Sequence, residues 1–227
     1  FLNGDKSAFA DQVLSSLRHI IFWSFPVVAL FIVLRAQIVR VILGTGEFGW
    51  PETKLTAAAL ALFSVSVVAQ SIILLLVRGY YAAGKTVIPL VVNITSSFFI
   101  VVCACIALNV YNTSEIFQYF MESLFRISFV SGTAVIMLPL AFSAGMLLNA
   151  YVLWWLFRRE FSISRAALGT TFRQSLYAAV VIGFVSYEAL DIFDNVFDIN
   201  TFLGIFMQGL LSGALGIAAG VLLLRLL

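Results

Sequence analysis

Polar side chains that could do chemistry recur inside one long apolar stretch of this sequence, 55–82. Ser64, Ser71 and Arg78 are spaced seven residues apart, and Gln70 precedes Ser71. A spacing of seven places side chains within about 40° of one another on a helix. These residues therefore predict one polar stripe, in which the planar guanidinium of Arg78 could contact a phosphate. The alternative for Arg78 is an anchor at the cytoplasmic end of the helix.

Two further apolar stretches carry polar residues of the same kind. Asn93, Ser96 and Ser97 share one arc of a helix over 87–110, and 129–157 contains Asn149. Polar groups within membrane spans mark substrate paths or pack helices together through hydrogen bonds. The sequence leaves both interpretations open, a hydrated cavity for a polar headgroup or plain helix packing. For the cavity, the candidate lining residues are Arg78, Ser71, Gln70, Asn93 and Ser97.

The residues give no catalytic, metal or cofactor site. His19 stands without a nearby acidic or Cys partner, and Cys103 and Cys105 would point about 200° apart on a helix. An acidic group near the C-terminus lacks the Gly-containing spacing of a calcium loop and predicts a solvated loop; it consists of Glu188, Asp191, Asp194 and Asp198. We therefore expect neither an enzyme nor a bound cofactor or metal ion.

The composition requires lipid as the solvent. Of the 227 residues, 62% are hydrophobic and 11% are charged, against about 25% charged in globular proteins. A net charge of +2 without a basic cluster gives no electrostatic footprint for nucleic acid. The elements that position the polar residues must therefore be membrane-spanning helices.

Six stretches are long and apolar enough to span a membrane, which takes about 20 residues. They cover approximately 18–35, 55–82, 87–110, 129–157, 173–190 and 202–225. The separators are turn-forming or charged segments. The fold class is thus an all-α integral membrane protein with about six transmembrane helices.

Lys and Arg in the loops predict the orientation. One side carries nine of the 13 basic residues, namely Lys6, Arg18, Arg78, Lys85, Arg158, Arg159, Arg165, Arg173 and Arg225. The other side carries Arg35, Arg40, Lys54 and Arg126. Both ends of the chain are therefore expected in the cytoplasm.

The segment 111–127 predicts an interfacial helix on the outer face, at about 114–126. Ile116, Phe120 and Leu124 repeat every four residues and would form one apolar ridge. The pattern Asn112-x-x-Glu115 is suited to cap the start of that helix.

The last span has a face of small residues. Gly209, Gly213, Gly216 and Gly220 are spaced by four, three and four residues and form two GxxxG units. This pattern predicts close packing against neighbouring helices.

The ends of the sequence suggest a piece of a longer polypeptide. The chain begins at Phe1 without an initiator Met, and it stops within a hydrophobic stretch at Leu227. We therefore expect further spans before residue 1.

Three segments resemble the MurJ (MviN) lipid II flippases. The segment 34–48 (LRAQIVRVILGTGEF) follows an apolar helix with Pro26 and ends in a G-x-F turn, as in that family. The helix that begins at 55–60 leads into the segment 78–89 (RGYYAAGKTVIP). This segment is similar to the family's pattern of an aromatic pair, a polar turn, a Thr and a Pro before the next helix. The segment 147–151 (LLNAY) is similar to the closing helix of the second lobe.

The resemblance implies a fold of fourteen helices, two lobes of six and a C-terminal pair. Residues 1–160 would be the last four helices of the second lobe, and 161–227 would be the pair, which forms a lipid-exposed groove with that lobe. The family moves lipid II, the undecaprenyl-pyrophosphate-linked peptidoglycan precursor of cell wall biogenesis, across the bacterial inner membrane by alternating access. Its partners would be lipid II, membrane lipids and the missing N-terminal lobe. The family's cationic cavity residues lie in helices outside this chain.

Two alternatives stay open. The chain could belong to another flippase or antiporter of the MOP superfamily, exporting O-antigen-type lipids or drugs. A cation-coupled drug exporter would usually carry an acid within the membrane, for which Glu188 is the one weak candidate. A non-transporting scaffold that binds a partner through its Gly face is the other alternative.

Overall fold

The computed structural model describes residues 6–44, 48–127, 130–163, 168–198 and 201–226. Thr45, Gly46 and Glu47 of the predicted G-x-F turn and the basic residue Arg165 lie outside this part of the chain.

All regular elements in the described residues are helices. They are α1 (Lys6–Val33), α2 (Arg35–Leu43), α3 (Trp50–Ala82), α4 (Val87–Thr113), α5 (Glu115–Phe125), the 3-10 helix η1 (Thr133–Ile136), α6 (Met137–Glu160), α7 (Gly169–Asp194) and α8 (Phe202–Leu226). Six of them, α1, α3, α4, α6 (extended by η1), α7 and α8, are long and apolar enough to cross a membrane. The predicted all-α membrane fold with six spans is therefore confirmed.

Local sequence signals explain several helix ends. Pro51 stands in the first turn of α3, where its missing N–H is not needed, and the carboxylate of Glu52 accepts from the N–H of Gly49 at 3.0 Å. The predicted cap of α5 is wrong, because α4 continues through Asn112. Ser114 caps α5 instead, and its hydroxyl accepts from the N–H of Phe117 at 3.3 Å.

The first helix starts well before the predicted residue 18. Lys6 begins α1, and Val13 and Leu17 are buried in a cluster with residues of α3 and α6. Tertiary packing thus supports helix where the hydropathy of the sequence is too low to predict a span.

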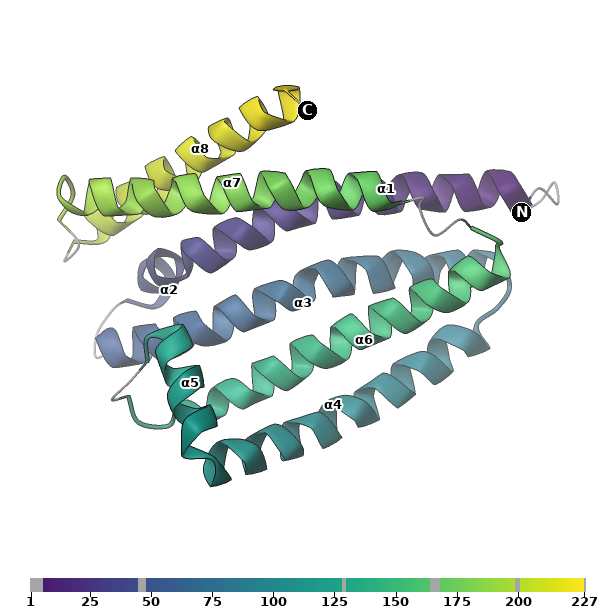
Figure 1. The fold of residues 1–227 in the computed structure, drawn as a ribbon, viewed down its shortest axis with the longest axis horizontal. Coiled ribbons are helices and arrows are strands. Elements are labelled where there is room, and N and C mark those ends of the chain that lie inside the picture. Colours follow the sequence, from purple (N-terminus) through teal and green to yellow (C-terminus); the bar gives the residue numbers. More distant parts are fainter. Residues whose placement is uncertain (1–5, 45–47, 128–129, 164–167, 199–200, 227) are drawn as a thin grey trace.

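The spans run back and forth between two ends of an elongated bundle (Figure 1). The helix α6 lies between α3 and α4 and packs along both, while α1 packs against α3 and α7, and α7 against α8. The short helix α2 packs on α3 and α8. We call the end that carries α5 the α5 end; the chain begins at the opposite end (Figure 1).

Two buried clusters hold α3 and α6 together, one near each end of the bundle. The cluster near the opposite end contains Val13, Leu17, Leu76, Tyr80, Val92, Leu153 and Phe157. The cluster at the α5 end contains Ala58, Tyr111, Met121, Ile127, Ile136 and Met137. Elsewhere large apolar side chains such as Ile94, Phe98 and Val180 stay exposed, as lipid contact requires.

Candidate functional site

A polar cleft opens between α3, α4 and α6. Its volume is about 390 Å³, and most of its lining residues lie between the two buried clusters along the helices. It is lined by Gln70, Ile73, Leu74, Val77, Asn93, Ser96, Ser97, Ile100, Met146 and Asn149. Three membrane-crossing helices thus present amide and hydroxyl groups to one space.

Asn93 and Asn149 join two walls of the cleft. Nδ2 of Asn149 donates a hydrogen bond to Oδ1 of Asn93 at 3.0 Å. Asn149 is only 5% exposed, and among the described residues its Oδ1 has no hydrogen-bond partner. A buried acceptor without a partner carries a desolvation penalty of about 1–3 kcal/mol. The wall of the cleft therefore contains a buried acceptor whose hydrogen-bonding capacity is unused.

The structure brings three of the five predicted lining residues together. Gln70, Asn93 and Ser97 line the cleft. Gln70 donates to the hydroxyl of Ser66 on its own helix at 2.9 Å, and Ser97 donates to the carbonyl of Asn93 at 2.9 Å.

The other two predicted lining residues lie outside the cleft. The hydroxyl of Ser71 donates to the carbonyl of Val67 on its own helix at 2.9 Å. Arg78 is exposed on α3, one turn beyond the lining residue Leu74 and towards the opposite end of the bundle. Arg78 therefore follows the cleft along α3 without lining it.

Asn149 and Ser96 are polar residues within predicted spans, but neither is among the five predicted lining residues. Ser96 is buried and lines the cleft beside Ser97. Only their residue type could have indicated these two positions. The periodicity of a helix does not say which neighbouring helix a polar side chain such as that of Asn149 faces.

A second cavity has the opposite chemistry. It is an apolar groove of about 480 Å³ between α1, α3, α6 and α7. Its lining is entirely hydrophobic apart from the backbone, and includes Phe25, Val65, Leu147, Val180 and Phe184. Such a groove suits a hydrocarbon chain.

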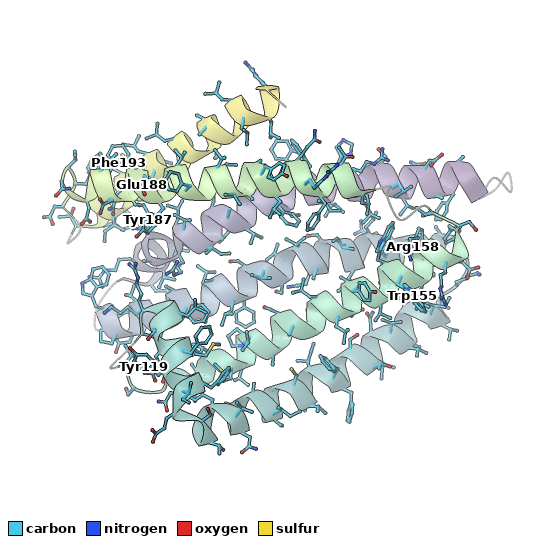
Figure 2. The ribbon with its side chains drawn as sticks, in the orientation of Figure 1. Tyr119, Trp155, Arg158, Tyr187, Glu188 and Phe193 are labelled. Carbon is cyan, nitrogen blue, oxygen red and sulfur yellow. The ribbon has the colours of Figure 1, made fainter. Side chains whose placement is uncertain are left out.

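The charged and ionisable candidates lie outside both cavities. Glu188, Asp191, Asp194 and Asp198 are exposed at the end of α7 and after it, and Figure 2 shows Glu188 near the α5 end. His19 is exposed, and its Nδ1 donates to the carbonyl of Ser15 at 2.8 Å. Among the described residues, no three His, Cys, Asp or Glu side chains gather as metal ligands would.

The glycines of α8 lie at close helix contacts. A Cβ added at Gly209 would be 3.2 Å from Cβ of Gln37, and one at Gly213 would be 3.2 Å from Cδ1 of Leu34. At Gly216 it would collide with Ser186 of α7, and at Gly220 with Ile182 of α7. The glycine stripe therefore faces two neighbours, the α1–α2 junction and α7.

Comparison with known proteins adds the family. The family model "Lipid II flippase MurJ" matches residues 1–208. No curated protein and no solved structure matches the chain. The match covers most of the 227 residues, and it agrees with six helices that can cross a membrane. The chain, a multi-pass membrane protein, belongs to the MurJ lipid II flippase family.

Proposed function

We propose that this chain forms one wall of the transport path in a lipid II flippase of the bacterial inner membrane. It would help to move the undecaprenyl-pyrophosphate-linked precursor to the outer leaflet by alternating access, as transporters built from lobes do. The observation that carries the proposal is the polar cleft between α3, α4 and α6, with the unpartnered Oδ1 of Asn149 in its wall.

The cleft has the chemistry to receive a polar headgroup at membrane depth. A polar side chain inside a bilayer costs free energy unless it has a partner, and a substrate headgroup is one such partner. The amides of Gln70, Asn93 and Asn149 and the hydroxyls of Ser96 and Ser97 offer both donors and acceptors. The headgroup of lipid II, a sugar-linked peptide, carries many hydroxyl and amide groups that could bind to them.

The apolar groove suits the other part of such a substrate. Val65 and Val68 line this groove from α3, whereas Gln70 and Ile73 line the cleft from the same helix. One helix thus separates a polar space from an apolar one. We assign the groove to the polyprenyl chain, which stays in a hydrocarbon environment there.

Charge supports the proposed orientation, with both ends of the chain in the cytoplasm. Lys85 pairs with Glu160 where α3, α4 and α6 meet at the opposite end of the bundle. The guanidinium of Arg159 lies 4.0 Å from the ring centroid of Trp155, and Figure 2 shows Trp155 and Arg158 at this same end. Basic side chains are enriched at a cytoplasmic interface, whereas aromatic side chains occur at both membrane interfaces, so the support for the orientation comes from the basic residues.

The same proposal assigns residues 1–160 to the second lobe and 161–227 to the C-terminal pair. An N-terminal lobe would then form the facing wall of the path and supply its cations. No acidic residue is among the described residues that line the cleft, so no observation favours a cation-coupled drug exporter.

Transport is tested in cells depleted of their own lipid II flippase. The full-length protein is expressed, and lipid II exposed on the outer leaflet is measured by its cleavage with an externally added lipid II-degrading enzyme. We expect cleavage to return to the level of undepleted cells. If the protein reaches the membrane at a normal level and cleavage stays at the depleted level, the proposed function is wrong.

A further inference from the structure

The helix α5 has an exposed apolar ridge that the rest of the described chain leaves uncovered. Ile116, Phe120 and Leu124 are 85%, 58% and 57% exposed. Their spacing of four residues places them within one sector of about 80°. A helix surrounded by water would not keep three such side chains in a row.

The opposite flank of α5 is polar. Glu115 and Gln118 are exposed, and on a helix they project well away from the ridge. Arg126, which ends α5 in a left-handed conformation, is exposed as well. A third sector faces the bundle, where Met121 is buried and Phe117 and Phe125 are packed against the cluster at the α5 end. The three sectors around α5 are therefore suited to contact with protein, with water and with an apolar phase.

A polar network holds α5 in this rotation. Oε1 of Glu122 accepts hydrogen bonds from Gln118 at 3.0 Å, from the hydroxyl of Tyr111 at 2.9 Å and from that of Thr133 at 3.0 Å. The hydroxyls of Tyr111 and Thr133 are themselves 2.7 Å apart. Since Tyr111 lies near the end of α4 and Thr133 begins η1, Glu122 connects α5 to both helices that flank it.

The depth of α5 follows from its connections. Ser114 alone separates it from α4, and η1 leads directly into α6. Both neighbours are long and apolar enough to cross a membrane, and α5 lies across their ends at one end of the bundle (Figure 1). In a membrane, this position is at the boundary between hydrocarbon and water. Tyr119, labelled on α5 in Figure 2, is 73% exposed, and tyrosine is enriched at this boundary.

We propose that α5 docks on the bilayer itself, with Ile116, Phe120 and Leu124 inserted among lipid acyl chains and the polar flank in the headgroup region. Amphipathic helices in this position bury their apolar face at the acyl boundary. Through Tyr111 and Thr133, the docked helix sets the depth of α4 and α6, which carry Asn93 and Asn149 of the cleft. This inference does not rest on the proposed transport activity.

Spin-label accessibility tests the occupant of the ridge. The full-length protein, with Cys103→Ala and Cys105→Ala, is reconstituted in phosphatidylethanolamine–phosphatidylglycerol vesicles. Single labels are placed by Ile116→Cys, Phe120→Cys and Leu124→Cys. The matched controls on the polar flank are Glu115→Cys and Arg126→Cys. The two relaxation agents are oxygen, which concentrates in the bilayer, and a water-soluble nickel chelate. Each labelled variant must unfold at the same temperature as the cysteine-free parent protein.

The ridge labels should respond several-fold more to oxygen than to the nickel chelate, and the two control labels should show the reverse order. A strong nickel response at all five positions would place the ridge in water and overturn the proposal. A weak response to both agents at the ridge would mean that protein covers it, which would also overturn lipid as the occupant. Three separate ridge positions keep the test decisive if one substitution prevents folding.

Discussion

The side-chain amide of Asn149 on α6 donates a 3.0 Å hydrogen bond to Oδ1 of Asn93 on α4, across a separation of 56 residues. The bond joins two membrane-crossing helices beside the cleft and leaves Oδ1 of Asn149 without a partner among the described residues. Packing alone would be served by a bond that satisfies both amides. Substrate binding and helix packing alone are the two roles to distinguish for this asparagine pair.

Replacing Asn149 by Leu tests this distinction. Asn149→Leu removes the donor to Asn93 and the unpaired acceptor while keeping a similar volume. We expect lipid II exposure per folded protein to fall about tenfold, since one lost hydrogen bond of about 1.4 kcal/mol changes a binding constant by that factor. The measurement is the external cleavage of lipid II, normalised to protein in the membrane.

The matched control is Ser143→Ala on the same helix. Ser143 is also buried, and its hydroxyl donates to the carbonyl of Leu62 on α3 at 2.6 Å, outside the cleft lining. This variant should lower the unfolding temperature and leave transport per folded protein unchanged. If Asn149→Leu behaves in the same way as Ser143→Ala, the asparagine pair serves packing only.

Arg78→Lys separates a phosphate contact from an anchor. Lysine keeps the charge but loses the planar fork that binds two phosphate oxygens at once. If Arg78 contacts the pyrophosphate of the substrate, transport should fall about tenfold at an unchanged protein level. Arg158→Lys, at the same end of the bundle but nine residues beyond the lining residue Asn149 of α6, should have no effect. Full activity of Arg78→Lys would reduce this arginine to an anchor.

Gly216→Leu should separate α7 from α8. Even a Cβ at Gly216 would collide with Ser186 and approach the carbonyl oxygen of Ile182 at 2.9 Å. Overpacking of this kind costs about 1–3 kcal/mol, so the unfolding temperature of the purified protein should fall. Gly169→Leu is the control, because a Cβ at Gly169 has no atom within 4 Å. Equal unfolding temperatures for the two variants would contradict a close α7–α8 contact at Gly216.

The anchoring of α5 should weaken in acid. The hydrogen bond from Gln118 holds the pKa of Glu122 below its usual value; partial burial opposes this shift, and the bonds from Tyr111 and Thr133 add to it. A carboxyl with a depressed pKa stabilises the fold above its ordinary pKa of about 4.3, and this contribution is lost as the pH falls through the depressed value.

The measurement is the unfolding temperature from pH 7 down to pH 3. Glu122→Gln should lower it at neutral pH and flatten its dependence below about pH 4. Glu115→Gln, at an exposed position on the same helix, is expected to retain the profile of the natural protein. A profile for Glu122→Gln that parallels the natural one would show that the network does not hold α5 through the charge of Glu122.

Much of the architecture was already determined by the sequence, since lipid imposes local rules. A backbone in hydrocarbon must satisfy its own hydrogen bonds, so apolar stretches of sufficient length become helices whatever surrounds them. For this reason all six spans could be predicted. The glycine spacing of α8 likewise indicates a face of small residues from the sequence of one helix alone. It does not predict that Gly209 faces Gln37 while Gly216 faces Ser186.

The composition of the cleft was decided by the tertiary structure. On a helical wheel Gln70, Ser71 and Arg78 belong to one broad stripe, yet only Gln70 lines the cleft. Asn149 is part of the cleft lining because α6 lies between α3 and α4 and turns this residue towards Asn93. Periodicity determines the angles between residues within a helix, whereas the rotation of a helix about its axis and its register against its neighbours come from side-chain packing between helices, which no single segment encodes.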